Sequence, residues 1–368
     1  MTTTQRLAIV GAGIISKQHG IAISKLQGEV ELVAVVDTDI AKARTLSEER
    51  GGRAYTTLTE ALAAESIDIV VICTPTGSHA EIAIEALEAG KHVIIEKPAD
   101  ITVDRADEII AAQAGSGTLV TVISQHRFDS STEIVLEAIG RGDFGRLTSG
   151  VASIDWWRGQ TYYDSGAWRG TWDLDGGGAL MNQGVHTVDL LVAAMGRPVE
   201  VFGYTATLAH ENIETEDVAV GVVRFESGAL GVIHGSTAVY PGLVARLQVH
   251  GDRGAAVIEN DQLTYFHSTP QGTERAEAFF GAQGGSTNQV SQFADPHGTE
   301  QTAGTSVAGQ MSDAHLHQYR NFLAAIRGDE QVRVSVEENR QSIAIITGLY
   351  ESTRTGAPVQ LFPAPVRS

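Results

Sequence analysis

Short apolar runs and helical patterns alternate along the first third of the chain. Five runs predict strands, at 7–10, 32–36, 68–73, 92–95 and 118–123. Helical patterns separate several of them, at 14–26, 78–89 and 103–114. Alternation of this kind implies right-handed crossovers between parallel strands. We therefore predict an amino-terminal domain over residues 1–124, built on a doubly wound parallel sheet.

The pattern changes after residue 124. A helical stretch at 131–139 precedes long segments of alternating apolar and polar positions, at 148–157, 199–208, 217–226, 229–238, 244–250 and 255–258. Helical patterns at 313–327 and 336–355 and a short apolar run at 358–362 close the chain. Period-two alternation is typical of antiparallel strands with one buried face. The predicted fold class is α/β, with residues 125–368 forming an α+β domain on a large, mostly antiparallel open sheet.

Residues 268–310 interrupt this pattern. They are rich in Gly, Gln, Ser and Thr and carry only isolated apolar side chains. Such composition is typical of a surface insertion, and the alternatives are a lid or a subunit-contact arm.

The first predicted strand runs into a glycine-rich turn, which consists of Gly11, Ala12, Gly13, Ile14, Ile15 and Ser16. Gly11 permits a tight turn, and Gly13 lets the backbone approach a pyrophosphate. The helix that follows directs its unpaired amides and the positive end of its dipole at the phosphates. Ser16 stands where a third glycine is usual, and it is small enough for close packing. The turn is therefore typical of dinucleotide binding.

A carboxylate at the end of the second strand completes this unit. Asp37 lies about 24 residues after Gly13, close to the spacing expected for a ribose-binding acid. It would accept hydrogen bonds from the ribose hydroxyls and repel a 2′-phosphate, so we expect NAD rather than NADP. An alternative role for Asp37 is the N-cap of the helix that starts at Ile40.

Composition and charge narrow the class of protein. The 368 residues are enough for two domains, each with its own core. A formal net charge of −19 disfavours nucleic acid and anionic membranes as partners. The single cysteine, Cys73, falls in an apolar strand, so we expect a buried, inert thiol. Without a signal-peptide pattern or a bilayer-spanning stretch, we expect a cytoplasmic location.

A lysine follows the strand predicted at 92–95, at a position where packing does not require one. Glu96, Lys97 and Pro98 follow that strand directly. Ligands bind in the crevice at the carboxyl ends of parallel strands, so Lys97 would direct its ammonium there. The alternative is a solvated lysine at a strand end.

A second polar group falls within an otherwise apolar helix, predicted to begin near Ala179. Asn182, His186 and Asp189 lie at i, i+4 and i+7, so they share one face of that helix. A lone histidine there is more often a satisfied core residue. Three aligned polar groups after a glycine-rich entry favour a ligand site.

Together these motifs resemble the Gfo/Idh/MocA oxidoreductase family over nearly the whole chain. The resemblance rests on the glycine-rich turn, Thr74-Pro75 with His79, Glu96-Lys97-Pro98, Arg127-Phe128 and the GGG…NQGVH…D segment at 176–189. It implies a Rossmann domain coupled to an α/β domain, whose open sheet forms homodimers or homotetramers. It also implies NAD-dependent oxidation or reduction of a hydroxyl or ketone on a sugar, sugar nucleotide or cyclitol.

The resemblance also assigns catalytic roles. His186 falls on the usual proton acceptor, and the near-neutral pKa of an ordinary histidine suits that task. Lys97 falls on the lysine that would stabilise the developing charge on the reacting oxygen. Asn182 stands where the family more often has Asp, and an amide orients substrate without supplying a charge.

Further positions are predicted to bind ligands. Cofactor contacts fall on Gly11, Gly13, Ile14, Ile15, Asp37, Thr74, Pro75, His79, Glu96 and Lys97. Substrate contacts fall on Arg127, Tyr163, Trp168, Arg169, Asn182 and Asp189. The segment around Trp168 and the helix are similar to a branch like the UDP-N-acetylglucosaminuronate 3-dehydrogenases, where aromatic faces and an arginine fork would suit a sugar with a carboxylate or phosphate. Alternatives are a packed aromatic cluster, a structural salt bridge at Arg127 and a helix-capping role for His79.

Two other functions are compatible with the same resemblance. A redox-elimination glycosidase would use bound NAD transiently, and a nucleotide or sugar sensor would not need Lys97 and His186. The spacing of His, Asp and Cys matches no compact zinc pattern, so we expect no metal.

Overall fold

The computed structural model groups the chain into two compact units. It describes residues 4–269, 272–274, 287–293 and 307–362. The first unit contains residues 1–125, 173–176 and 304–340, and the second contains residues 126–172, 177–303 and 341–368. The predicted division at residue 124 treats each domain as one continuous stretch. The compact units instead combine segments that lie far apart in the sequence.

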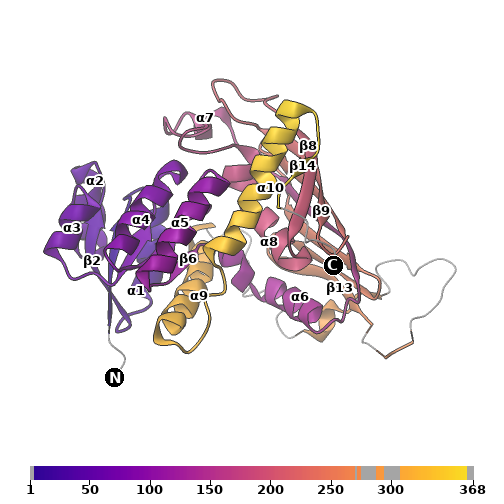
Figure 1. Ribbon diagram of the computed structural model, residues 1–368, viewed down its shortest axis with the longest axis horizontal. Helices are drawn as coiled ribbons and strands as arrows, with labels where there is room; N and C mark the ends of the chain where they lie inside the picture. Colours follow the sequence, from indigo (N-terminus) through magenta and orange to yellow (C-terminus); the bar gives the residue numbers. More distant parts are fainter. Residues whose placement is uncertain (1–3, 270–271, 275–286, 294–306, 363–368) are drawn as a thin grey trace. The chain divides into compact units, whose positions relative to one another are not determined.

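A six-stranded parallel sheet forms the middle of the first unit (Figure 1). Its strands are β1 (Gln5–Val10), β2 (Val30–Val36), β3 (Arg53–Tyr55), β4 (Ile69–Ile72), β5 (His92–Ile95) and β6 (Val120–Val122). The helices between them are α1 (Ile14–Ser24), α2 (Ile40–Arg50), α3 (Leu58–Ala64), the 3₁₀ helix η1 (Thr76–Ser78), α4 (His79–Glu88) and α5 (Val103–Ser116). The strand order is β3-β2-β1-β4-β5-β6, so it reverses between β1 and β4, where ligands bind in such sheets. The predicted parallel sheet is confirmed.

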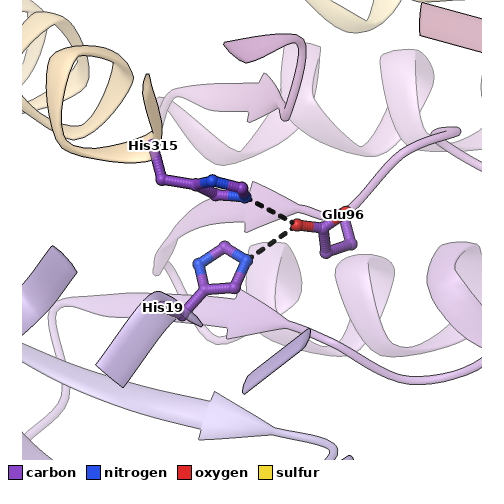
Figure 2. A group of neighbouring side chains, drawn as sticks. All are labelled: His19, Glu96 and His315. Carbon is purple, nitrogen blue, oxygen red and sulfur yellow. Dashed lines mark hydrogen bonds and ion pairs between the residues drawn. The ribbon is translucent and has the colours of Figure 1, made fainter. Parts of the chain in front are cut away.

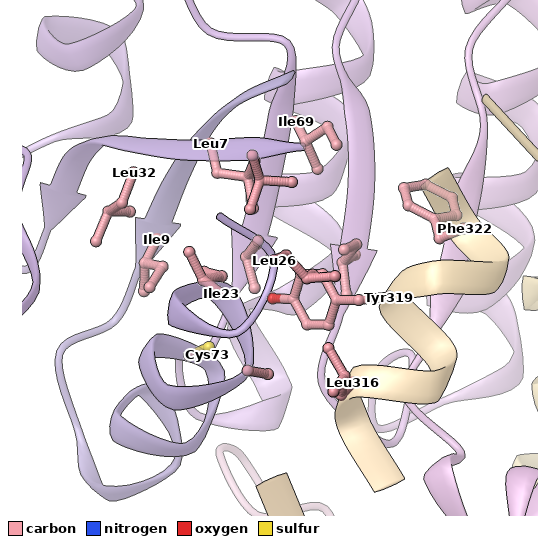
Figure 3. Close-up of a cluster of buried hydrophobic side chains, with 14 of the residues drawn as sticks. Leu7, Ile9, Ile23, Leu26, Leu32, Ile69, Cys73, Leu316, Tyr319 and Phe322 are labelled. Atoms are coloured by element: carbon pink, nitrogen blue, oxygen red, sulfur yellow. The ribbon is translucent and has the colours of Figure 1, made fainter. Parts of the chain in front are cut away.

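The hydrophobic core of the first unit includes a helix from near the end of the chain. Helix α9 (Val307–Arg327) lies against α1. Figure 3 shows Tyr319 and Phe322 of α9 beside Leu7 of β1 and Leu26, all at most 2% exposed. Burial of such large apolar side chains is a main stabilising term in folding. It joins α9 to the first unit.

An eight-stranded sheet dominates the second unit, in the order β13-β12-β11-β7-β10-β9-β8-β14. Its strands are β7 (Leu147–Asp155), β8 (Pro198–Ala206), β9 (Val218–Phe225), β10 (Leu230–Ser236), β11 (Ala245–Gly251), β12 (Gly254–Glu259), β13 (Gln262–Ser268) and β14 (Val359–Gln360). β7 and β10 pair in parallel, and the other neighbours pair antiparallel. The predicted, mostly antiparallel open sheet is confirmed.

Helical segments of several kinds connect these strands. They are η2 (Gln125–Phe128), α6 (Ser130–Gly140), α7 (Gln160–Tyr163), the π-helix η3 (Ala179–Gly184), α8 (Val185–Met195), η5 (Val290–Gln292) and α10 (Val336–Thr355). Among the described helices, none combines the length and apolar character that crossing a bilayer requires.

Glycines let helices approach the inner face of this sheet closely. A Cβ atom at Gly203 would lie 2.6 Å from Cδ2 of Leu349 in α10, and one at Gly221 would lie 2.4 Å from it. A Cβ atom at Gly150 would lie 2.6 Å from Cδ1 of Leu191 in α8. Larger side chains at these positions would push the helices away, which explains part of the high glycine content.

The opposite face of the sheet exposes apolar side chains. Five of them are 45–59% exposed: Tyr204, Val220, Val222, Leu230 and Val232. Val222 lies opposite Val232, and Tyr204 lies opposite Val220, so these side chains form one continuous patch. We call it the outer apolar face.

Two strands of the structure, β3 and β13, were not predicted from the sequence. β3 has three residues and no fully buried position, so it lacks an apolar pattern. Most of the predicted insertion at 268–310 lies outside the described residues. Its residues 287–293 follow β13, where the Gln289 amide donates to the Phe266 carbonyl at 2.7 Å.

Candidate active site

The glycine-rich turn adopts the conformation that a dinucleotide requires. Gly11 has φ +96°, and a Cβ atom there would lie 2.6 Å from the Cys73 carbonyl group. Gly13 precedes α1, whose first turn has no side-chain cap, and a Cβ atom at Gly13 would meet nothing within 4 Å. Open space beside uncapped helix amides fits a pyrophosphate. The residues present therefore fit NAD.

The two glycines predict different mutational effects. Gly13→Ala should leave the melting temperature nearly unchanged but raise the NAD dissociation constant by about tenfold or more, because its methyl group enters the phosphate space. Gly11→Ala should lower the melting temperature, because it combines a positive φ with a backbone clash. Thermal melts and NADH fluorescence titrations separate these outcomes. Tight NAD binding by Gly13→Ala would contradict the assignment.

Asp37 holds the turn in place. Its Oδ2 accepts a hydrogen bond from the Ala12 amide at 2.8 Å, and its Oδ1 accepts one from the Asp39 amide at 2.9 Å. The N-cap of α2 is Asp39, which accepts from the Ala41 amide. The alternative role of Asp37 as that cap is therefore wrong, and its contact with the ribose remains a prediction.

His79 connects the ends of two neighbouring strands. The side chain is 1% exposed, and its ring nitrogens lie 2.9 Å from the Thr74 carbonyl oxygen and 2.9 Å from the Pro98 carbonyl oxygen. Thr74 also accepts a hydrogen bond from the Ser78 hydroxyl. These contacts support a bracing role for His79 next to Pro75 and Lys97. The contacts of Thr74, Pro75 and His79 with the cofactor remain predictions.

Glu96 is the acceptor of a buried histidine cluster (Figure 2). Its Oε1 lies 2.8 Å from Nε2 of His19 and 3.2 Å from Nε2 of His315. Its Oε2 accepts from the Lys97 amide at 3.1 Å, and Nδ1 of His19 lies 2.8 Å from the Tyr319 hydroxyl. The carboxylate therefore fixes the backbone at Lys97. The contact of Glu96 with the cofactor remains a prediction.

Electrostatics keep this carboxyl ionised. Burial alone would raise the pKa of Glu96, but the hydrogen bonds from His19 and His315 hold that pKa well below its ordinary value. Burial lowers the pKa of His19. The ligand atoms of the three residues lie within 4.8 Å of one another, yet hydrogen bonds account for the arrangement. The absence of a metal remains a prediction.

Cys73 lies at the end of β4 with a buried side chain. Burial raises the pKa of its thiol well above the ordinary value, so the reactive thiolate is strongly disfavoured. The predicted burial of this thiol is confirmed, and its inertness remains a prediction.

A buried carboxylate starts the helix that carries the proposed base. Glu216 accepts hydrogen bonds from the amides of Gly178 and Leu180 and from the Tyr350 hydroxyl. Burial raises the pKa of Glu216 to about 7 despite these bonds. A Cβ atom at Gly178 would lie 2.0 Å from the Glu216 carbonyl oxygen, so only glycine allows this approach. Glu216 was not predicted as a site residue, since nothing in the neighbouring sequence distinguishes it from other acidic residues.

The predicted α-helix from Ala179 is wrong over its first turn. Residues 179–184 form a π-helix, and α8 begins at Val185. A π-helix has a longer hydrogen-bond repeat than an α-helix, so the expected spacing does not apply to Asn182 and His186. Both side chains are half-buried, whereas Asp189 is 1% exposed.

Asp189 forms a buried ion pair with Arg127. The Nε and Nη2 atoms of Arg127 donate to the two carboxylate oxygens at 2.7 and 2.8 Å. The Ser342 hydroxyl donates to the same carboxylate at 3.4 Å. The structural salt bridge that was the alternative for Arg127 is therefore present, and it anchors η2 to α8. Contacts of Arg127 and Asp189 with substrate remain predictions.

Two arginines lie beside aromatic rings in the same unit. The Arg158 guanidinium donates to the Gln183 side-chain oxygen at 2.7 and 3.0 Å, and Gln183 donates to the Asn182 oxygen at 2.7 Å. Gln183 also donates to the Tyr162 hydroxyl, which accepts from Arg169. A hydrogen-bonded chain thus connects both arginines to Asn182.

The aromatic rings stack on these guanidiniums. Arg169 lies 4.2 Å from the ring centre of Tyr162 and 4.5 Å from that of Trp168. Arg158 lies 5.0 Å from the ring centre of Trp156. Among the described residues, neither arginine forms an ion pair with an acidic side chain. Trp168 and Arg169 were predicted from the sequence, whereas Arg158 and Gln183 were not. Arg158 lies outside the recognised motifs, and Gln183 lies within the NQGVH segment but was given no role there.

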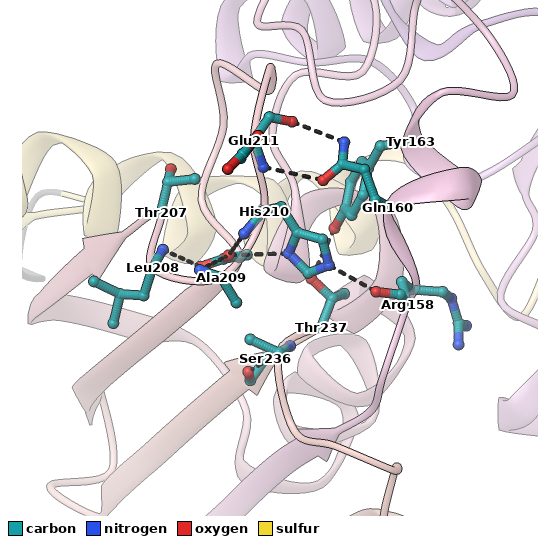
Figure 4. Close-up of polar contacts among 12 residues, drawn as sticks. Arg158, Gln160, Tyr163, Thr207, Leu208, Ala209, His210, Glu211, Ser236 and Thr237 are labelled. Carbon is teal, nitrogen blue, oxygen red and sulfur yellow. Dashed lines mark hydrogen bonds and ion pairs between the residues drawn. The ribbon is translucent and has the colours of Figure 1, made fainter.

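Tyr163 packs edge-to-face against Tyr162 of this network, with ring centres 5.2 Å apart. Its side chain is 5% exposed, its hydroxyl lies 2.7 Å from the Thr237 hydroxyl, and burial raises its pKa to about 12. Its ring lies beside His210, which contacts Asp217 and the Arg158 carbonyl (Figure 4). These contacts support the packing role that was the alternative for Tyr163, and its contact with substrate remains a prediction.

Family models match both parts of the chain. The model described as the oxidoreductase family with an NAD-binding Rossmann fold matches residues 5–124. The GFO/IDH/MocA C-terminal domain model matches residues 133–257.

Individual proteins match over most of their length. Inositol 2-dehydrogenase of Rhizobium meliloti is 30% identical over 70% of this chain and 77% of its own. Myo-inositol 2-dehydrogenase of Thermotoga maritima is 27% identical over 92% of this chain and 93% of its own. The WlbA dehydrogenase of Bordetella pertussis, solved with NADH and UDP-GlcNAcA, is 30% identical, covers 98% of this chain and 99% of its own, and has a TM-score of 0.82.

Proposed function

This chain belongs to the GFO/IDH/MocA oxidoreductase family as an NAD-dependent enzyme acting on CH–OH groups, and we propose that its substrate is an anionic sugar or sugar nucleotide. The observation that carries this proposal is the pair of arginines stacked on aromatic rings and connected to Asn182. In a chain of net charge −19, guanidiniums whose partners among the described residues are neutral suit a carboxylate or phosphate.

His186 and Lys97 divide the chemistry in this proposal. Bound NAD supplies the hydride acceptor. His186 accepts the hydroxyl proton, because a neutral imidazole is a base near neutral pH. Lys97 stabilises the negative charge that develops on the oxygen, and Glu96 positions it through the Lys97 amide. Asn182 orients the substrate, with its own oxygen fixed by Gln183.

A substrate panel tests the proposal. The wild-type protein should reduce NAD with UDP-N-acetylglucosaminuronate, the ligand of the WlbA dehydrogenase, far better than with the neutral sugars N-acetylglucosamine and myo-inositol. NADH absorbance reports turnover, and NADP runs in parallel. Preference for myo-inositol would contradict the anionic substrate. Release of a leaving group without net NADH would instead show a redox-elimination glycosidase.

Removing one positive charge should change substrate preference. Arg169→Gln should raise KM for the anionic sugar by about 10–100-fold, because a charge-assisted hydrogen bond is lost, and should leave kcat on a neutral sugar nearly unchanged. Steady-state kinetics on both substrates measure this. The matched control is Arg224→Gln, which removes an arginine paired with Glu200. Equal losses on charged and neutral substrates would contradict the assignment.

We also propose that two copies of the chain pack through the outer apolar face. Apolar patches of this kind on a folded protein mark interaction sites. Light scattering after size exclusion should give a dimer or tetramer, and Val222→Lys should shift it towards monomer. Leu208→Lys, at an exposed position outside the face, is the control. A monomeric wild type would contradict the proposal.

The buried single cysteine is consistent with the cytoplasm, which we propose as the compartment. Cell fractionation with an antibody against the protein tests this. Recovery from an extracytoplasmic fraction would contradict it.

A further inference from the structure

A second histidine cluster lies in the second unit, on the segment that follows β6. Nδ1 of His126 lies 2.9 Å from Oδ2 of Asp129 and 3.0 Å from Oδ1 of Asp261. The three side chains are 23–43% exposed, and they come from η2, the start of α6 and the turn between β12 and β13. Two carboxylates converging on one ring nitrogen favour the imidazolium form. The imidazole ring of His126 therefore carries a positive charge in this cluster.

The local structure is organised around this contact. Asp129 is the N-cap residue of α6, yet its side chain makes no capping hydrogen bond and turns to His126 instead. Asp261 has φ +64° and follows Asn260 at φ +45°, conformations that cost energy in residues other than glycine. The Ser131 hydroxyl donates to the Asp261 carbonyl at 2.7 Å, which ties the hairpin turn to α6.

The charge of His126 follows from these neighbours. Burial alone would lower the pKa of His126, but Asp261 and Asp129 raise it to about 10. The pKa of Asp261 is lowered by the same contact, despite burial. At neutral pH the cluster therefore contains one positive and two negative charges.

His126 lies directly beside the proposed base. The ring centres of His126 and His186 are 5.0 Å apart, and the ring planes meet at 84°. Such edge-to-face contacts stabilise one relative orientation of two rings. The next residue, Arg127, pairs with Asp189, one turn beyond His186 on the same helix. Adjacent residues of one segment thus contact α8 at two successive levels.

We propose that His126, held as a cation by Asp129 and Asp261, is a positioning residue that orients the His186 ring and makes protonation of that ring less favourable than a neutral ring at position 126 would. A positive charge 5.0 Å away disfavours a second one on His186. The two carboxylates act in the opposite direction, so single substitutions separate the contributions. The catalytic consequence rests on the proposed function, whereas the coupling of the two rings does not.

Charged groups on the described elements around His186 can be controlled. Arg127 and Asp189 neutralise each other, and Glu216 starts the preceding π-helix. The inner faces of β7 and β11, against which α8 packs, present apolar residues such as Ile154 and Leu247. Glu216→Gln serves as the control for a titration that originates at the start of the helix.

His126→Phe is the decisive variant, because it keeps an aromatic ring and removes the charge. We expect the NMR titration midpoint of the His186 ring to rise by about one pH unit, and the acid limb of kcat/KM to move with it. Asp261→Asn, which removes a negative charge, should shift the midpoint downwards. His126→Gln, which removes the ring, should also lower kcat at optimal pH while KM changes little. Resonances of His186 are assigned by comparison with His186→Asn.

An unchanged His186 midpoint in His126→Phe overturns the inference. If His126→Phe folds poorly, the double variant His126→Phe with Asp261→Asn removes one cation and one anion together. Its midpoint should then exceed that of Asp261→Asn alone, and equality would also overturn the inference. If the midpoint rises but His186→Asn keeps normal turnover, the coupling stands and the proposed function fails. The two failures are therefore distinguishable.

Discussion

His186→Asn is expected to lower kcat on the sugar substrate by about 10²–10⁴-fold, the usual contribution of a general base. Asparagine is polar but cannot accept the hydroxyl proton near neutral pH. The affinity for NADH should stay within about twofold of the wild-type value, because the glycine-rich turn that fits the dinucleotide lies between β1 and α1. Stopped-flow turnover and NADH fluorescence measure the two quantities.

A matched control is available on the outer face of the sheet. His234 of β10 pairs with Asp155, and His234→Asn should leave kcat unchanged. Lys97→Met should lower kcat by about 10²–10³-fold, because it removes the charge that stabilises the reacting oxygen. Near-normal turnover in both His186→Asn and Lys97→Met would show that the site is wrongly assigned.

Arg127→Met is expected to cost about 3–5 kcal/mol of unfolding free energy, because it leaves the Asp189 carboxylate buried and unpaired. The methionine fills most of the volume, so the loss reports the charge. Urea denaturation measures the free energy. Adding Asp189→Leu should recover most of the loss, since the unpaired charge is then gone.

A more exposed ion pair, Arg340 with Asp107, provides the comparison for this loss of unfolding free energy. Arg340 contacts Asp107 through both carboxylate oxygens, but the two side chains are 23% and 47% exposed. Arg340→Met should therefore cost only about 0–1 kcal/mol. A similar small cost for Arg127→Met would contradict the buried ion pair.

Most of the first unit could be predicted from the sequence. Apolar runs at 7–10 and 69–72 match β1 and β4, because a parallel strand buried on both faces is apolar at every position. The turn at Gly11 was recognisable because a positive φ and a close backbone approach both demand glycine. Helix α9 was predicted as a helix, but its packing against α1 was not, since an apolar helix face does not indicate which element it packs against.

The polar contacts of the site were harder to predict. Glu96 was found from its motif, but its partners His19 and His315 lie 77 and 219 positions away. Asp189 fell on the predicted helix face, and only the tertiary structure showed Arg127 opposite it. Periodicity reports which side of an element is buried, and it carries no information about which charges meet there.

The sequence by itself determined the succession of elements, the dinucleotide turn, the family and the candidates Lys97 and His186. These features are local, because strand and helix periods, turn glycines and short motifs all act within a few residues. The tertiary structure decided that Arg127 pairs with Asp189, that hydrogen bonds connect Arg158 and Arg169 to Asn182, and that His126 lies beside His186. Those contacts depend on burial and charge pairing between distant segments, and the free energy of such pairs exists only once the chain has folded.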